Sequence, residues 1–183
     1  MVTSVRPSGS SSCTVGINAA NSAPWFEDGV TEVGPGELCR YVEGGGNLLV
    51  IHAGCDVNPE WLPHEAKFRD PCRAYIDLIG CHFVNHPPRC AVTVRPTGIH
   101  PLTDGVQPFT CRDEHYIIKL AADEVTPLLE TESETGGRQI GGYLRTVGMG
   151  KIVLYTPGHT LSVWQNENWQ RLLRNTIAYL TQK

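Results

Sequence analysis

The segment Asn47-Leu48-Leu49-Val50-Ile51-His52-Ala53-Gly54 decides the fold class of this chain. Its first five residues are nearly all apolar, and glycines precede the run at 44–46 and follow it at 54. A short apolar run bounded in this way is typical of a central strand that is covered on both faces. Open α/β sheets bind ligands at the carboxyl ends of such strands, which is where His52 would lie. The sequence therefore predicts an α/β fold with a candidate site at His52.

A second segment near the C-terminus repeats this arrangement. Lys151-Ile152-Val153-Leu154-Tyr155-Thr156 is strongly apolar and runs directly into Pro157-Gly158-His159. If the two strands are neighbours, His52 and His159 meet at one edge of the sheet. Imidazoles titrate near neutral pH, so two of them beside carboxylates can act as general base and acid or bind a divalent metal.

Local patterns predict the remaining elements. Helices are expected around 38–42, over 71–79 and over 169–180, the last from an apolar stripe at i, i+3, i+4 and i+7 spacing. Strands are expected at 13–18, 91–95, 116–120 and 125–130. Gly136-Gly137 is typical of a hairpin tip that leads into 139–145.

The composition predicts one globular domain. The chain has 183 residues, of which 40% are hydrophobic and 19% charged, so it is long and apolar enough to bury a core. Residues 1–12 are rich in Ser, Gly and Thr and are predicted to form a flexible arm, which leaves 13–183 as the domain. Seven cysteines without a CxxC pair favour reduced thiols over a disulfide framework or a zinc ribbon.

Charge and hydropathy exclude several classes of partner. The formal net charge is -4 and the isoelectric point is near 5.9, so no basic field attracts nucleic acid or anionic lipid. No apolar run approaches the roughly 20 residues that span a bilayer, and the N-terminus lacks the pattern of a signal peptide. These features predict a cytoplasmic protein that binds neither nucleic acid nor a membrane.

Several separated strings recur along the chain in a characteristic order. They are Tyr41-Val42-Glu43-Gly44-Gly45-Gly46, Val50-Ile51-His52-Ala53-Gly54, Leu78-Ile79-Gly80-Cys81-His82-Phe83-Val84-Asn85-His86-Pro87, His100-Pro101-Leu102-Thr103-Asp104-Gly105, Asp113-Glu114-His115-Tyr116 and Gly150-Lys151-Ile152-Val153 through Gly158-His159. Taken together they resemble the ThuA-like (trehalose utilisation) family of the class I glutamine amidotransferase-like superfamily. The resemblance covers about Cys13 to the C-terminus, and it implies a three-layer, flavodoxin-like fold with a mostly parallel sheet and a role in carbohydrate metabolism.

The chain departs from this resemblance in two ways. Relatives that are glutamine amidotransferases carry a nucleophilic cysteine where His52 stands, so ordinary glutamine hydrolysis is not expected. Residual amidase chemistry through Cys55 is an alternative that requires a thiol of low pKa near His159. The sequence before Cys13 also lacks the first βα unit that the resemblance implies. We therefore expect either a truncated chain or a partner that covers the sheet edge, and the second case favours a homo-oligomer.

Further candidate residues surround the two histidines. Glu114 is predicted to orient a histidine or contact a sugar hydroxyl, and alternation along the chain puts Tyr116 on the same side as Glu114, with Asp113 and His115 opposite. The predicted catalytic residues are His52, His159 and Glu114. The predicted substrate-binding residues are His86, Asn85, His115, Tyr116 and Trp164.

No metal ligand is assigned and no cofactor is required, because neither spacing nor thiolates mark a zinc site. A divalent metal such as zinc, held by histidines among 52, 86, 115 and 159, stays open as an alternative. The leading hypothesis is an enzyme that acts on a sugar or keto-sugar derivative by His/Glu acid-base chemistry. The alternative is a non-catalytic carbohydrate-binding or assembly module on an amidotransferase-like scaffold. In that case the histidines and Glu114 are only structural or solvated groups.

Overall fold

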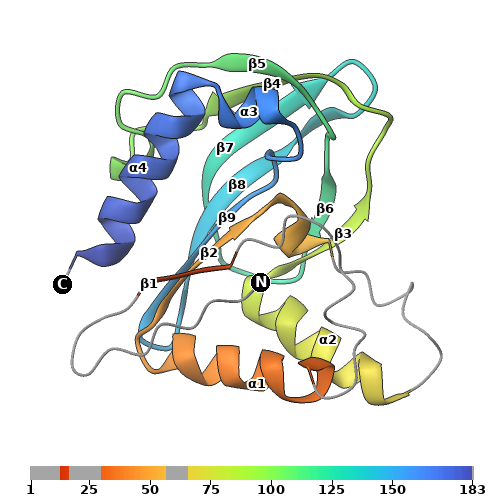
Figure 1. Ribbon diagram of the computed structural model, residues 1–183, viewed down its shortest axis with the longest axis vertical. Coiled ribbons are helices and arrows are strands. Elements are labelled where there is room, and N and C mark those ends of the chain that lie inside the picture. The colour runs from red at the N-terminus through yellow and green to blue at the C-terminus, as the bar shows by residue number, and fades with distance from the viewer. Residues whose placement is uncertain (1–12, 17–29, 57–65, 183) are drawn as a thin grey trace.

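The computed structural model describes residues 13–16, 30–56 and 66–182 (Figure 1). The predicted arm at 1–12 and the end of the first predicted strand, at 17–18, lie outside the described residues. No helix within the described ranges is long and apolar enough to cross a bilayer.

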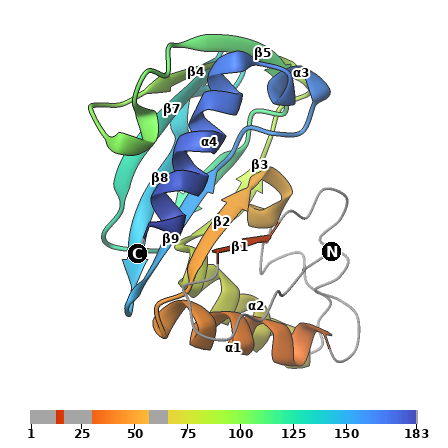
Figure 2. The same cartoon turned by 60° about the vertical axis from the view of Figure 1, so that its left-hand side comes forward.

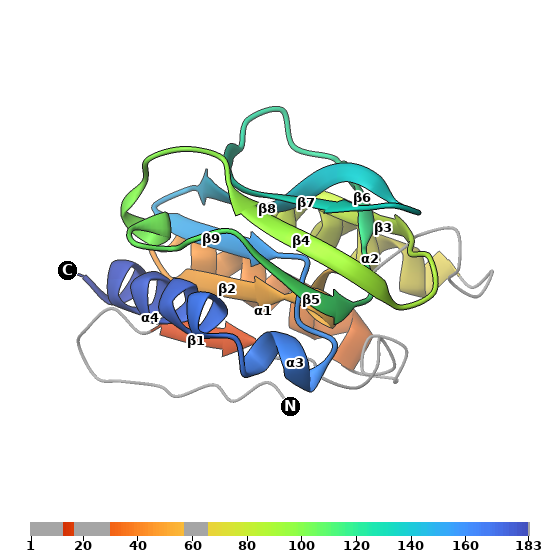
Figure 3. The ribbon, with the colours of Figure 1, turned by 90° about the horizontal axis from the view of Figure 1, so that it is seen from above.

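Within the described residues, seven strands form one mixed sheet. In spatial order they are β1 (Cys13–Gly16), β2 (Asn47–Ile51), β9 (Gly150–Tyr155), β8 (Gly137–Val147), β7 (Thr126–Ser133), β4 (Cys90–Pro96) and β5 (Phe109–Asp113). Figure 3 shows β1, β2, β9 and β8 side by side in this order. The predicted strands thus exist with small shifts at their ends, and the α/β class is confirmed.

The prediction of a mostly parallel sheet is wrong. Only the β1–β2 and β2–β9 pairs are parallel, whereas β9–β8, β8–β7, β7–β4 and β4–β5 are all antiparallel. The reason is the length of the connections. β7 joins β8, and β8 joins β9, through turns of a few residues, which permit only antiparallel neighbours, while the parallel pair β1–β2 has a helix between its strands.

Helices cover both faces of the parallel part of the sheet (Figures 1 and 2). α1 (Val30–Glu43) and α2 (Ala66–Ile79) lie on one side, and α4 (Glu167–Thr181) lies on the other, preceded by the short α3 (Leu161–Trp164). Alternate residues of β2 enter two separate cores: Leu48 and Val50 face α1 and α2, and Leu49 and Ile51 face α4. The central strand is therefore buried on both faces, as its apolar run predicts.

A second, two-stranded sheet completes the site. β3 (Cys81–Asn85) pairs antiparallel with β6 (Ile117–Leu120), and short 3-10 turns follow β2 as η2 (His52–Cys55) and β4 as η3 (Pro101–Thr103). Sequence patterns did not predict β3 or β5. Both alternate in burial along the strand, so period-2 hydropathy was the available signal.

The start of β9 is set by a close backbone approach. A Cβ added at Gly150 would clash with the carbonyl oxygens of Val42 and Gly46, where the end of α1 meets the sheet. We expect Gly150→Ala to lower the free energy of unfolding by about 2 kcal/mol or more, because backbone atoms cannot yield as a flexible side chain can. Chemical denaturation checks this, with Gly98→Ala as the matched control, since nothing lies within 4 Å of a Cβ there. Equal stabilities of the two variants would contradict the packing.

Candidate active site at the ends of β2 and β9

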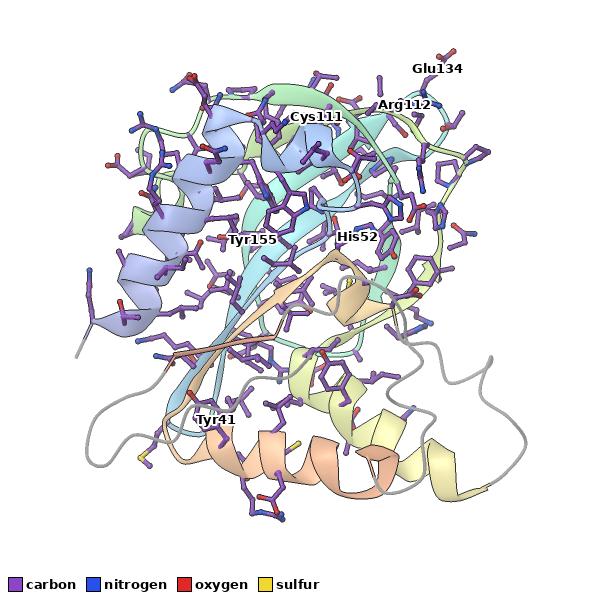
Figure 4. The ribbon with its side chains drawn as sticks, viewed as in Figure 1. Tyr41, His52, Cys111, Arg112, Glu134 and Tyr155 are labelled. Carbon is purple, nitrogen blue, oxygen red and sulfur yellow. The ribbon has the colours of Figure 1, made fainter. Side chains whose placement is uncertain are left out.

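The predicted meeting of His52 and His159 is confirmed. β2 and β9 are parallel neighbours in which Ile51 pairs with Tyr155, so both strands end at the same edge. The two imidazole centroids lie 5.3 Å apart at an interplanar angle of 71°. Figure 4 shows His52 at the end of β2.

His52 has an unusual backbone and a defined tautomer. Its φ is 47°, in the left-handed region that favours glycine, and such strain in non-glycine residues is concentrated at functional sites. Nδ1 lies 2.7 Å from the Thr156 carbonyl oxygen, which can only accept, so Nδ1 carries the hydrogen. In the neutral ring Nε2 is then an acceptor; it is buried and has no hydrogen-bond partner in the part of the chain that the structure describes.

Burial lowers the pKa of His52, while the Thr156 hydrogen bond and the negative charges of Asp113 and Glu114 oppose this shift. The neutral imidazole, with its lone pair at Nε2, is therefore the favoured form. A neutral imidazole can accept a proton or bind a metal ion.

Glu114 lies at the centre of the site. Its Oε2 is 3.1 Å from His159 Nδ1, 3.4 Å from His52 Nε2 and 3.7 Å from His86 Nε2. Its Oε1 is 3.4 Å from Arg89 Nε, and its side chain is only 13% exposed. One carboxylate thus joins three imidazoles and a guanidinium. We call His52, Glu114 and His159 the central triad.

Arg89 sets the tautomer of His159. Its Nη2 donates to His159 Nε2, and because a guanidinium only donates, the hydrogen of the neutral ring sits on Nδ1. That Nδ1–H points at Glu114 Oε2. A carboxylate on one ring nitrogen orients the imidazole and stabilises its protonated form, as in serine-hydrolase triads. The sequence did not indicate Arg89 as a site residue. The one available clue was its position two residues after the family-like segment that ends at Pro87.

Asp113, adjacent in sequence to Glu114, holds the backbone beneath His159. Its carboxylate, 1% exposed, accepts hydrogen bonds from the backbone N–H groups of Gly158 (2.9 Å), His159 (3.1 Å) and Thr160 (3.0 Å). From alternation along the strand, the sequence predicted that Asp113 and Glu114 point to opposite sides, but it indicated no function for Asp113.

Three more side chains line the site. Tyr116 lies 4.0 Å from His52 and stacks on His86 at 5.6 Å, ring centroid to centroid. Burial raises the pKa of Tyr116, which keeps the phenol protonated. Burial also raises the pKa of Asp56, whose Oδ1 has no hydrogen-bond partner among the described residues and which the sequence did not indicate as a site residue.

The other predicted binding residues do not join the triad. His115 is buried between the hydroxyls of Ser133 (2.6 Å from Nδ1) and Thr131 (3.1 Å from Nε2). Trp164 donates its indole N–H to the Gly158 carbonyl and packs edge-on against Trp169, so it supports the loop below His159. Asn85 is exposed at the end of β3.

Cys55 does not meet the requirement for amidase chemistry. Its thiol is fully buried and donates to the carbonyl of His52. The hydrogen bond with Cys81, together with burial, raises the pKa of Cys55 well above its ordinary value. A nucleophilic cysteine needs the opposite shift.

Comparisons with solved structures define the class of this fold. A ThuA-like protein from Bacteroides uniformis aligns with a TM-score of 0.62 at 17% identity over 80% of this chain and 62% of its own. A cytoplasmic protein from Salmonella typhimurium aligns at 0.60 and 14% identity over 81% of this chain and 61% of its own. A cold-adapted β-galactosidase from Rahnella aligns at 0.58 and 14% identity, over 84% of this chain and 21% of the enzyme.

The family follows from the sequence itself. The model of the trehalose utilisation family, ThuA, matches residues 22–180, and the chain therefore belongs to that family. It spans 62% of the length of the Bacteroides protein. No curated protein sequence matches it significantly.

We expect Asp113→Asn to lower the free energy of unfolding by about 2–4 kcal/mol. The substitution removes the negative charge that accepts three backbone N–H groups, and it turns one of the two acceptor oxygens into an NH₂ donor. Urea denaturation measures the change. Asp123→Asn is the control, since Asp123 is exposed and should lose less than about 0.5 kcal/mol. A loss equal to the control's would show that Asp113 does not anchor the loop.

Acidification should destabilise the protein partly through His115. Burial lowers its pKa from 6.5 in the folded state, so the unfolded chain binds the proton first as the pH falls. The stability that the neutral His115 ring contributes to the folded state is therefore fully present above about pH 6.5 and is lost progressively as the pH falls below it. The free energy of unfolding is measured at pH 7.5 and pH 5, and we expect it to fall less between these values in His115→Gln than in the wild type. An equal fall in both proteins would contradict this contribution of His115.

Proposed function

We propose that this member of the ThuA family is an enzyme that acts on a sugar or keto-sugar derivative by proton transfer at the central triad. Family membership implies a role in trehalose utilisation or related carbohydrate metabolism. The single observation that carries the catalytic proposal is the carboxylate of Glu114, shared at 3.1 and 3.4 Å between two imidazoles at a sheet edge.

The contacts support distinct tasks for these groups. With Nδ1–H donated to Glu114, His159 keeps its lone pair at Nε2, where a substrate proton could be accepted once Arg89 turns aside. His52 Nε2 is the second nitrogen able to take or return a proton. Arg89, freed from His159, could stabilise negative charge that develops on a substrate oxygen, such as the oxygen of a ketone.

This assignment fits hydrolysis or elimination at a keto sugar. Removal of a proton next to a carbonyl leaves its electron pair on the carbonyl oxygen as an enolate, and the departing group takes a proton from the conjugate acid. No nucleotide cofactor enters such a reaction. We further propose that the binding partner is a small sugar. We also propose a cytoplasmic location, which is what the name of the Salmonella protein gives for that protein.

A non-catalytic module is the second candidate. The observation that favours it is the β-galactosidase similarity, in which this fold makes up about a fifth of a larger enzyme chain. A second copy of the chain covering β1, the edge of the described sheet, would suit an assembly role.

Turnover of trehalose, its keto derivatives and related disaccharides, followed by NMR, tests the proposal. We expect His52→Ala, His159→Gln and Glu114→Gln each to lose about 100-fold or more in kcat/KM, the usual share of one acid-base group. His159 is exposed enough that its variant should keep the wild-type thermal transition within a few degrees.

His100→Gln and Cys55→Ala serve as controls and should retain turnover, because His100 caps η3 outside the triad and Cys55 is a buried thiol. Undiminished activity of His159→Gln would refute the acid-base role. Sugar binding by calorimetry without turnover of any compound would favour the non-catalytic module.

A further inference from the structure

We infer that the central triad binds one divalent transition-metal ion of the zinc type through His52 Nε2, His159 Nδ1 and Glu114 Oε2. The three atoms lie within 4.8 Å of one another. This inference rests on the residues of the proposed function and deepens it, because a bound ion would carry the acid-base chemistry on a coordinated water and leave the side chains as ligands.

The first argument is a pair of facing acceptors. The Thr156 carbonyl fixes the hydrogen of His52 on Nδ1, so Nε2 presents a lone pair. Nε2 belongs to a side chain that is 7% exposed, has no hydrogen-bond partner within residues 13–16, 30–56 and 66–182, and faces Glu114 Oε2 at 3.4 Å. Two acceptors at this distance repel unless something positive lies between them. An ion bound to both atoms would satisfy each lone pair.

The second argument is spacing. Nitrogen and oxygen ligands at about 2.0–2.1 Å from a tetrahedral zinc ion lie roughly 3.3–3.4 Å from each other. Glu114 Oε2 is 3.4 Å from His52 Nε2 and 3.1 Å from His159 Nδ1. Three protein ligands would leave a fourth position for water, which is the pattern of catalytic rather than structural sites.

The third argument is the support behind the ligands. Histidines that bind metal commonly donate their other ring nitrogen to a backbone carbonyl, as His52 does to Thr156. Asp113 fixes the backbone of His159. Two imidazoles with one carboxylate suit Zn²⁺, Co²⁺ or Fe²⁺, whereas Mg²⁺ and Ca²⁺ prefer all-oxygen sites.

Arg89 competes with the ion. Its contact at His159 Nε2 holds a hydrogen on Nδ1, and this hydrogen must leave before Nδ1 can bind metal. The Arg89 side chain is 50% exposed, so it can turn into solvent. Once Arg89 turns away, Nε2 takes the ring hydrogen and Nδ1 is left with a lone pair. Metal binding therefore exchanges one tautomer for the other without net proton release, and it should not be weakened when Arg89 is shortened.

The test is calorimetric titration of chelator-treated full-length protein with ZnCl2, together with visible spectra of the Co²⁺ form. We expect one ion per chain and intense tetrahedral Co²⁺ bands. His52→Ala, His159→Ala and Glu114→Gln should each weaken binding at least tenfold. Arg89→Gln should bind zinc at least as tightly as the wild type.

Two histidines outside the triad provide matched controls. His115→Gln and His100→Gln should bind zinc as the wild type does, because His115 bonds hydroxyls of β7 and His100 caps η3. Absence of one-to-one binding, or equal affinity in the wild type and all three triad variants, would overturn the inference.

Activity separates this inference from the proposed function. Absence of zinc binding, together with turnover that is lost in His159→Gln, would overturn the metal site and leave the acid-base proposal standing. Tight zinc binding that depends on the triad, without turnover of any sugar, would support the metal site and count against the enzyme.

Discussion

The site depends on the parallel pairing of β2 with β9. This register places Ile51 beside Tyr155, so the chain leaves both strands at the same level and delivers His52 and His159 to one rim. Burial of β2 on both faces fixes the pairing, because a shift of one residue would exchange Leu48 and Val50 with Leu49 and Ile51 between the two cores. The same packing that stabilises the sheet therefore positions the imidazoles.

Two adjacent acidic residues at the end of β5, Asp113 and Glu114, hold the residues at the ends of β2 and β9 in place. Asp113 bonds three backbone N–H groups at 158–160, and Glu114 turns the other way toward the side chains of the two histidines. Asp113 thus holds the backbone of His159, and its neighbour Glu114 holds the imidazole. Precision of this kind is what acid-base catalysis or metal binding requires of its supporting residues.

The sequence predicted the two buried strands and their terminal histidines because continuous apolar runs between glycines have few structural alternatives. Glu114 and Tyr116 were placed on one side by simple alternation, and both contact the site. The hairpin at Gly136-Gly137 was also predicted, but the rest of the antiparallel half was not, since the family resemblance implies a mostly parallel sheet although the short turn at 148–149 permits only antiparallel strands. Arg89 and Asp113 could not be found, because their partners lie 70 and 45 or more residues away in sequence.

The mixed sheet has a consequence for how the chain acquires its shape. β7, β8 and β9 are joined by tight hairpins whose contacts are local, whereas β2 must find β9 across about a hundred residues. Local contacts form with less loss of chain entropy, so we expect the hairpins to organise early and to act as a template on which β2 docks later. The two imidazoles would then come together only at the end of folding, and the strained backbone at His52 would be imposed by docking onto a surface already in place.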